Sequence, residues 1–270
     1  LFATAESVGI MGKGRTHNLN RAITSDGTTT TLHRQDTRQL KLIVLSSNDT
    51  SRTWQADADI HYQLTESLDA GTTTGWTLTL DDKSIEQYNS AGRLDSVTSR
   101  NGFTRTLAYE NDLLKTVTGH FGRTLSFEYT DGLMSKVIDP AQEATLYNYD
   151  DQQRLETITS PDQRTITYLY EDTNHPDSIT GIKENGVRTA TYSYYDDGKV
   201  QSSELAGGVN KVTMTYNEDG TTTVVDALNA ERIYEFETIL GVRKVVNVTG
   251  DTCASCGANI NRREYDSIGN

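Results

Sequence analysis

Two cysteines form the pair in this sequence that is most suited to chemistry, in the segment Cys253-Ala-Ser-Cys256. Such a pair can close a local disulfide, remain as free thiols, act in redox chemistry or supply half of a zinc site. A zinc site needs about four ligands, and neither a second Cys-x-x-Cys nor a nearby His pair is present. A redox pair usually opens a helix, which lowers the pKa of one thiol, and no helix is expected here. We therefore expect a loop-closing disulfide, with free thiols as the alternative.

Two carboxylates and an imidazole occur at alternate positions in Asp57-Ala-Asp59-Ile-His61. In a strand they would share one face, because side chains alternate between the two faces. Mixed oxygen and nitrogen ligands of this kind can hold a divalent cation. A solvated strand face explains the same pattern, and we favour it. No metal site is therefore predicted.

The remaining candidate groups do not assemble into a known catalytic motif. The other histidines are scattered through the chain, and neither HExxH nor GxSxG occurs. The segment Gly12-Lys13-Gly14 suggests a phosphate loop, but the distance from Gly9 to Lys13 is too short for that motif. We expect no enzymatic activity and no cofactor. The scattered histidines are His17, His33, His120 and His175.

Composition and charge exclude several classes of protein. The 270 residues include 38 acidic and 25 basic side chains, for a net charge of −13, which argues against nucleic acid as a partner. No apolar run approaches the roughly 18 residues of a membrane span. Hydrophobic residues make up only 34%, whereas there are 40 Thr and 14 Tyr. Thr and Tyr favour strands with a half-wet surface, so extended two-faced sheets are expected.

An aromatic residue recurs at a nearly constant interval along most of the chain. From Tyr109 to Phe236 the successive gaps are 20, 20, 21, 24, 22 and 20 residues. One further aromatic precedes this series by 21 residues and another follows it by 29. Such a period is the signature of a repeat architecture. The predicted structural anchors are Tyr88, Tyr109, Tyr129, Tyr149, Tyr170, Tyr194, Tyr216, Phe236 and Tyr265.

Each period also carries two turn signals. One follows the aromatic residue by three or four positions, and the other lies near the middle of the repeat. Two turns leave two strands of about six or seven residues, so each repeat is predicted to be one antiparallel β-hairpin. A hairpin alone is marginal in water, and stacking buries a continuous face. We therefore predict an all-β fold in which hairpins of about 20 residues stack into a long curved sheet. The predicted turn glycines are Gly92, Gly132, Gly198 and Gly220.

The residues around the anchors resemble those of a known family. Tyr-Asp followed by a polar pair and Gly-Arg-Leu is typical of RHS or YD-repeat proteins. The similar segments are Tyr88-Asn-Ser-Ala-Gly92-Arg-Leu94, Tyr149-Asp-Asp-Gln-Gln-Arg-Leu155, Tyr195-Asp-Asp-Gly198-Lys-Val200 and Tyr265-Asp-Ser-Ile-Gly269-Asn270. The resemblance covers about residues 83–270. In addition, the segment from Met11 to Asn18 is similar to the glycine-and-His motif that precedes the repeats in this family.

The resemblance implies a sheet wound as a spiral into a hollow shell. In toxin complexes the shell encloses a toxic domain, and in teneurins it is an extracellular adhesion module. We therefore expect a non-catalytic structural segment of such a shell, secreted or at the cell surface. Its partners would be the rest of its own polypeptide, an enclosed cargo domain or a second copy. The alternative is a surface module that binds carbohydrate or protein. The chain ends inside a new repeat, which suggests a fragment.

Residues 1–82 lack the period and are expected to form a β cap on the repeat strip of residues 83–270. Asp26-Gly27 predicts a hairpin that includes residues 28–33. Leu40 to Leu45 predicts a buried strand, and Trp54 and Trp76 are expected core residues. A cap is needed because the open end of a sheet exposes unpaired backbone groups.

Overall fold

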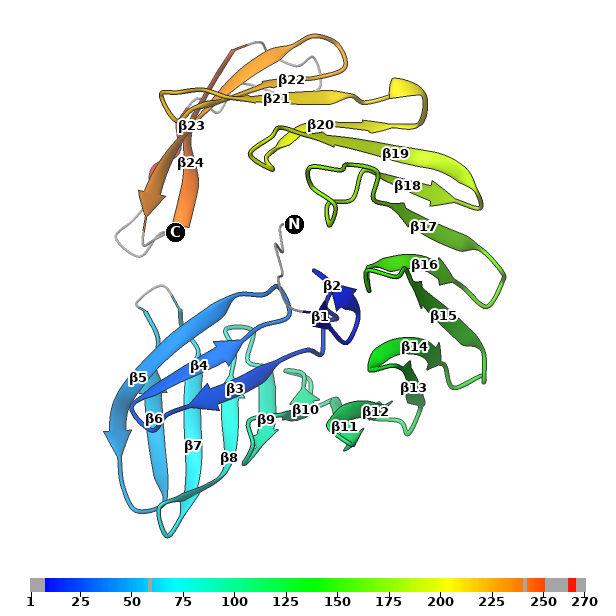
Figure 1. Cartoon of the computed structure of the whole chain (residues 1–270). Helices are drawn as coiled ribbons and strands as arrows, with labels where there is room; N and C mark the ends of the chain where they lie inside the picture. The colour runs from blue at the N-terminus through cyan, green and yellow to red at the C-terminus, as the bar shows by residue number, and fades with distance from the viewer. Residues whose placement is uncertain (1–7, 58–59, 240–241, 251–261, 266–270) are drawn as a thin grey trace. The chain divides into compact units, whose positions relative to one another are not determined.

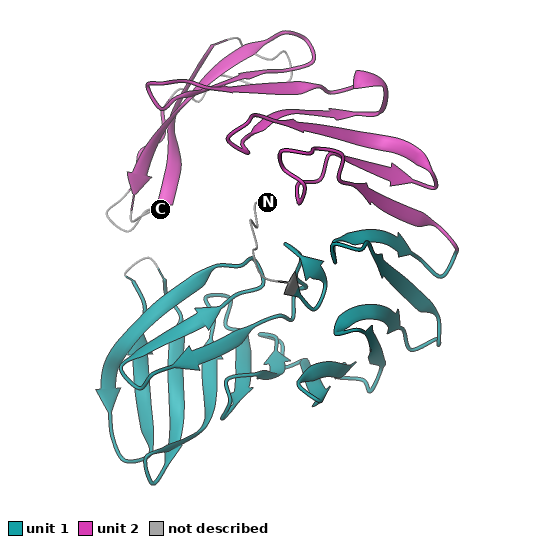
Figure 2. Cartoon of the chain, in the orientation of Figure 1, with its two compact units in different colours: residues 1–162 teal, residues 163–270 magenta. Residues whose placement is uncertain are grey.

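The computed structural model describes residues 8–57, 60–239, 242–250 and 262–265. Its regular elements are β-strands, with a single short 3₁₀ turn at Ala206–Gly208 among the described residues. The all-β prediction is therefore confirmed. The chain divides into two compact units, residues 1–162 and residues 163–270 (Figure 2).

Within unit 1, the strands from β3 to β16 pair antiparallel with their sequence neighbours (Figure 1). Before them, β1 and β2 form a small hairpin of their own. The strands of unit 1 are β1 (Val8–Gly9), β2 (Gly12–Lys13), β3 (Ala22–Ser25), β4 (Thr29–His33), β5 (Gln39–Ser47), β6 (Ser51–Gln55), β7 (Gln63–Asp69), β8 (Thr72–Thr79), β9 (Ile85–Asn89), β10 (Leu94–Thr98), β11 (Thr104–Glu110), β12 (Leu113–Thr118), β13 (Thr124–Thr130), β14 (Leu133–Ile138), β15 (Ala144–Tyr149) and β16 (Leu155–Thr159).

Unit 2 continues the same antiparallel pattern, and each of its strands pairs with its sequence neighbours inside the unit. Its strands are β17 (Thr165–Leu169), β18 (Gly181–Glu184), β19 (Val187–Tyr194), β20 (Val200–Leu205), β21 (Val212–Tyr216), β22 (Thr222–Val225), β23 (Glu231–Ile239) and β24 (Val242–Gly250). The interval of 24 residues between Tyr170 and Tyr194, the longest between Tyr109 and Phe236, contains the extended connection from β17 to β18. An insertion in this connection therefore accounts for the irregular spacing.

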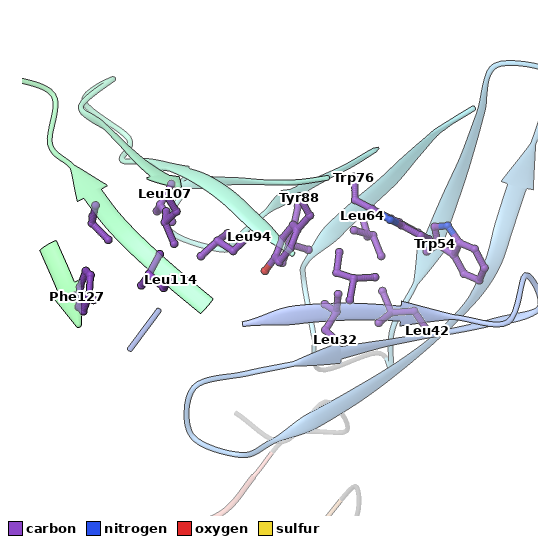
Figure 3. Close-up of a cluster of buried hydrophobic side chains, with 14 of the residues drawn as sticks. Leu32, Leu42, Trp54, Leu64, Trp76, Tyr88, Leu94, Leu107, Leu114 and Phe127 are labelled. Atoms are coloured by element: carbon purple, nitrogen blue, oxygen red, sulfur yellow. The ribbon is translucent and has the colours of Figure 1, made fainter. Parts of the chain in front are cut away.

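The core of unit 1 lies between β3–β5 and β6–β9 (Figure 3). Leu32 and Leu42 come from the first group of strands, and both are fully buried. Trp54 and Trp76 come from the second, with ring centroids 6.0 Å apart. The hairpin of β3 and β4 and the core position of both tryptophans are as predicted from the sequence. The same core extends along the repeats as far as Met134.

The prediction of a buried strand at Leu40–Leu45 is only half right. These residues lie in β5, but Leu42 is 0% exposed while Ile43 and Leu45 are 65% and 64% exposed. Side chains of a strand alternate between its faces, and only one face of β5 packs on the core. A continuous apolar run therefore does not imply burial of both faces here.

The turns use residues with positive φ angles in two ways. Tight two-residue turns place both central residues in the left-handed region, as at Asp131 (φ 52°) and Gly132 (φ 80°). This geometry matches the twist of the paired strands. Longer turns place one residue there, and in three repeats it is a predicted turn glycine: Gly92 (φ 76°), Gly198 (φ 79°) and Gly220 (φ 85°). Glycine adopts these angles without steric cost.

Gly92 also permits a close approach between distant parts of unit 1. The Ile23 amide donates a hydrogen bond to the Gly92 carbonyl at 2.8 Å. A Cβ atom at Gly92 would overlap the Ile23 carbonyl, whereas one at Gly132 would meet open space. Gly92 therefore holds β3 against the turn that joins β9 and β10.

We predict that Gly92→Ala destabilises unit 1 far more than Gly132→Ala. Both changes force alanine into positive φ, which costs about 1–2 kcal/mol. Gly92→Ala must also separate β3 from the turn, for a total on the order of 3 kcal/mol or more. Urea unfolding followed by tryptophan fluorescence measures both variants, because both tryptophans lie in unit 1. Equal losses of stability would contradict this assignment of Gly92.

Candidate functional site

The repeat tyrosines lie near the ends of their strands, opposite an irregularity in the pairing. In β11, β13 and β15 the register shifts immediately before Tyr109, Tyr129 and Tyr149. The same shift precedes Tyr194 in β19. A β-bulge of this kind bends its strand and redirects side chains.

The hydroxyl groups of these tyrosines connect neighbouring hairpins. Each donates a hydrogen bond to the backbone carbonyl of the residue 15 positions earlier, at 2.6–2.8 Å. We call this series the tyrosine ladder. Its donor–acceptor pairs are Tyr109–Leu94, Tyr129–Leu114 and Tyr149–Met134 in unit 1, and Tyr194–Ile179 in unit 2.

The ladder in unit 1 is continuous because each acceptor carbonyl belongs to the strand partner of the preceding ladder tyrosine. Leu114 is the strand partner of Tyr109, and its carbonyl accepts the hydroxyl of Tyr129. Met134 is the partner of Tyr129 in the same way, and it accepts from Tyr149. Each tyrosine therefore bonds to the bulge of the preceding hairpin.

Burial of the ladder raises the pKa values of its phenols. It raises the pKa of Tyr109 to about 12 and that of Tyr149 to about 12, from an ordinary value of about 10. For Tyr129 and Tyr194, burial raises the pKa as well. The ladder residues are half-buried and keep their protons at neutral pH.

The remaining predicted anchors have different surroundings. Tyr170 is half-buried directly after β17. Tyr216 packs edge-on against Tyr195, with ring centroids 6.1 Å apart. Arg243 lies 4.3 Å from the ring centroid of Phe236. The Tyr265 hydroxyl donates a hydrogen bond to the Val245 carbonyl at 2.8 Å, 20 residues earlier. The role of all these aromatic residues as repeat anchors stays a prediction.

Tyr88 is fully enclosed in a charged cluster that sequence reasoning missed. Its hydroxyl donates to Glu86, a carboxylate that is 0% exposed. Arg34 donates to both Glu86 oxygens, at 2.7 and 3.0 Å, and Arg21 donates as well. Burial alone would raise the pKa of Glu86, but Arg34, Tyr88 and Arg21 together outweigh it and hold the pKa below its ordinary value. Burial also raises the pKa of Tyr88. The sequence contains one indication of this cluster: Glu86 and Tyr88 are two residues apart, so in a strand their side chains lie on the same face.

The N-terminal hairpin of β1 and β2 docks onto the repeats. The Met134 amide donates to the Ile10 carbonyl at 2.7 Å, and the Lys13 amide donates to the Gln153 carbonyl at 3.0 Å. A Cβ atom at Gly12 would lie 2.5 Å from that Gln153 carbonyl. Glycine is therefore required for this contact. The segment from Met11 to Asn18 supplies β2 of this docked hairpin.

A cluster of exposed aromatic rings lies on two adjacent turns of unit 1. Phe103 and Phe121 are 50% and 79% exposed, with ring centroids 5.6 Å apart. His120 is 5.1 Å from Phe103 and 5.0 Å from Phe121. We call these three residues the turn aromatic cluster. Its signal in the sequence is a phenylalanine beside a mid-repeat glycine in two successive repeats.

The other candidate groups do not form a site in the part of the chain that the structure describes. Cys253, Cys256 and Asp59 lie outside the described residues. Asp57 and His61 lie in the connection between β6 and β7 and are not in a strand. Among the described residues, no group of three His, Cys, Asp or Glu side chains is arranged to hold a metal ion. His175 contacts Asp172 (Nδ1 to Oδ2, 3.2 Å) within a loop.

Within the described ranges, none of the helical structure is long and apolar enough to cross a membrane.

Comparison with known proteins shows similarity only to solved structures. No family model matches the chain, and no curated protein matches it. A mutant of the Photorhabdus luminescens Tc holotoxin pore is 12% identical over 88% of this chain and 16% of its own, with a TM-score of 0.43. The TcdB2-TccC3 crystal structure is 13% identical over 85% and 15%, with a TM-score of 0.33.

A third similar structure is a porin-like protein from Bacteroides uniformis. It is 11% identical over 87% of this chain and 99% of its own, with a TM-score of 0.32. The chain spans about one sixth of the length of the two toxin chains. At these identities and scores, the likeness is one of β-rich fold and assigns no activity.

We predict that Tyr194→Phe weakens the packing of β19 on the preceding connection, while Tyr192→Phe leaves it intact. Removing the hydroxyl leaves the Ile179 carbonyl without its donor, at a cost of about 1 kcal/mol. Among the described residues, the Tyr192 hydroxyl makes no hydrogen bond, so it is the matched control on the same strand. Hydrogen–deuterium exchange of the β18 and β19 amides measures the difference. Similar exchange in both variants would show that the ladder bond does not stabilise unit 2.

We predict that unit 1 loses stability between about pH 10 and pH 12. An unfolded tyrosine ionises near 10, whereas Tyr109 and Tyr149 hold their protons to about 12 in the folded state. The stability from these raised pKa values is complete below 10 and is lost as the pH rises to 12. Unfolding free energies across this range measure the loss. The double variant Tyr109→Phe, Tyr149→Phe should show a shallower dependence, and an unchanged slope would contradict the prediction.

Proposed function

We propose that this chain is a non-catalytic structural segment of a β-shell of the RHS or YD-repeat kind. The observation that carries the proposal is the tyrosine ladder, in which four repeat tyrosines each donate a hydrogen bond to a backbone carbonyl 15 residues earlier. A constant link between identical units produces a strip with regular geometry, as in other repeat proteins. Such a strip is suited to forming a wall.

The low burial of side chains in unit 2 supports this proposal. It is what we expect of a wall in which at most one face of the sheet is packed against the rest of this chain. Among the described residues of unit 2, Ala190 is the one hydrophobic side chain that reaches full burial. The side chains of β19 and of β21 are mostly half-buried instead. A sheet of this kind suits a thin shell that faces solvent or an enclosed space better than it suits a thick globular core.

In this proposal, two parts of the chain have different structural roles. Residues 1–82 would cap the strip, and residues 83–270 would form the repeat wall. The packing of β3–β5 against β6–β9 supports the cap, because it covers a sheet face before the first ladder tyrosine. This functional boundary is separate from the boundary between the compact units at residue 162. The partners would be the rest of a longer polypeptide and an enclosed cargo domain, at a secreted or surface location.

The turn aromatic cluster favours a second candidate function, a surface module for adhesion. Exposed aromatic rings stack on sugar rings and also anchor protein partners. Phe121, at 79% exposed, is available for either kind of contact. Glycan-array binding that is lost in the double variant Phe103→Ala, Phe121→Ala and retained in Leu228→Ala would support this alternative, because Leu228 is a turn residue of unit 2 that is 88% exposed.

The shell is tested with the segment expressed together with its native flanking sequence. Electron microscopy should show a hollow particle, and a protease should spare the enclosed part of the polypeptide. A triple variant, Tyr129→Phe, Tyr149→Phe, Tyr194→Phe, should open the wall and expose that part to the protease. Tyr192→Phe is the control and should preserve protection. An extended particle without enclosed volume, or equal proteolysis in all variants, would overturn the proposal.

A further inference from the structure

Two exposed arginines flank a glycine at one end of the repeat strands in unit 1. Strand β12 pairs with β11 on one side and with β13 on the other. Continued by one residue toward the turn, the register of both pairs places Gly119 between Arg105 and Arg123. Apart from its chain neighbours, a Cβ atom on Gly119 would meet one atom within 4 Å, the Arg123 carbonyl oxygen at 3.6 Å. We call the open space between the two arginines the Gly119 gap.

The guanidinium groups beside this gap have no counterion in the part of the chain that the structure describes. Arg105 and Arg123 form no ion pair and no side-chain hydrogen bond there, and neither does Arg100 in the turn that joins β10 to β11. All three side chains are exposed. Residues 96–109 and 113–127 contain no Asp or Glu. Unpaired charge of one sign attracts a ligand of the other sign, so the gap favours an oxyanion although the whole chain has a net charge of −13.

The turn aromatic cluster borders the same place. Phe103 precedes Arg105 by two residues, and Phe121 precedes Arg123 by two residues. The rings of the cluster are inclined to one another at 53°, 57° and 82°. No two of them form a common flat platform, so they suit an inserted apolar side chain better than the flat face of a sugar. A ligand here would therefore combine negative charge with an apolar group.

Acidic residues on the neighbouring turns limit the size of this surface. Alternate hairpin turns lie at the same edge of an antiparallel sheet. The turn before the basic pair carries Asp81 and Asp82, and the turn after it carries Asp139 and Glu143. A flat anionic membrane would meet these carboxylates as well and be repelled. An extended chain can stay on the two basic turns, which are two strand spacings or about 10 Å apart, the length of about three extended residues.

We propose that the Gly119 gap and the turn aromatic cluster bind an acidic, extended segment of a partner protein. A carboxylate would lie between Arg105 and Arg123, because guanidinium groups bind its oxygens in a two-pronged geometry. An apolar side chain of the same segment would contact Phe103 and Phe121. Arginine and aromatic residues are enriched in protein interfaces. The inference rests on the second candidate function, adhesion through the turn aromatic cluster, and it names the class of partner.

The test begins with selection from a phage library of random heptapeptides against the full chain. The enriched peptide is then labelled, and fluorescence anisotropy measures its affinity for the unchanged protein and for each variant. Arg105→Gln and Arg123→Gln each remove one charge beside the gap. Arg38→Gln is the control, since it removes the same charge from another exposed turn of unit 1.

Gly119→Leu fills the gap and leaves every charge in place. Ser99 and Asp139 occupy the equivalent turn position in the neighbouring hairpins, where each amide donates to the carbonyl four residues later, as that of Gly119 does. Gly119 is also absent from the glycines with positive φ angles. A side chain is therefore compatible with the backbone at this position. Thermal melting checks that the variant is folded.

We expect the enriched peptides to carry at least two Asp or Glu residues beside an apolar residue. Arg105→Gln and Arg123→Gln should each weaken binding about tenfold, as the loss of a charge-assisted hydrogen bond implies. Gly119→Leu should weaken it at least as much, whereas Arg38→Gln should bind within about twofold of the unchanged protein. If Gly119→Leu lowers the melting temperature, the two exposed arginine variants decide. Enrichment of peptides without acidic residues, or equal weakening in Arg38→Gln, would overturn the inference.

Glycans and vesicles of phosphatidylserine in phosphatidylcholine are tested in parallel. Binding of glycans that is lost in the double variant Phe103→Ala, Phe121→Ala, with no selection of acidic peptides, would overturn the acidic segment and leave adhesion through the cluster standing. Binding to the vesicles in place of acidic peptides would overturn the inference in favour of a lipid surface. If neither peptides nor glycans bind, the inference and the second candidate function both fail, and the shell is decided by its own protease test.

Discussion

A β-hairpin of two short strands buries too little surface to be stable alone, and every repeat in this chain therefore depends on its contact with the one before. The tyrosine ladder provides that contact in a directed form. A half-buried ring fills the space between hairpins, and its hydroxyl satisfies a backbone carbonyl beside a bulge. The same side chain thus contributes apolar burial and fixes the offset between repeats. The regular geometry of the strip follows from this link.

The two units protect their sheets in different ways. In unit 1, strands from the first part of the chain and the docked hairpin of β1 and β2 cover the core, which runs from Leu32 to Met134. In unit 2 the side chains remain mostly half-buried. The hydrophobic content of the sequence is only 34%, which is consistent with a sheet that has few fully buried side chains. The fully buried core therefore lies in unit 1, where side chains of β3–β5 and β6–β9 pack together.

The acidic residues serve mainly the turns. Asp219, for example, accepts hydrogen bonds from the amide and the hydroxyl of Thr221, and these bonds lower its pKa. Asp139 and Asp226 accept backbone amides in the same type of turn. Two of the basic residues have a different role, since Arg21 and Arg34 form ion pairs with the buried carboxylate of Glu86. Much of the negative charge of the sequence is therefore carried by exposed turn residues, whereas Glu86 is buried and paired.

The sequence by itself determined the strands, the period and the turns, because these depend on neighbouring residues. Positive-φ glycines and alternating apolar residues act locally, and the hairpin of β3 and β4 forms where Asp26-Gly27 predicts it. Only the tertiary structure decided the acceptor of each tyrosine, the exposure of Ile43, the docking of Ile10 on Met134 and the burial of Glu86. These features arise where segments far apart in the chain approach closely, and a local pattern of residue types does not encode which segments meet.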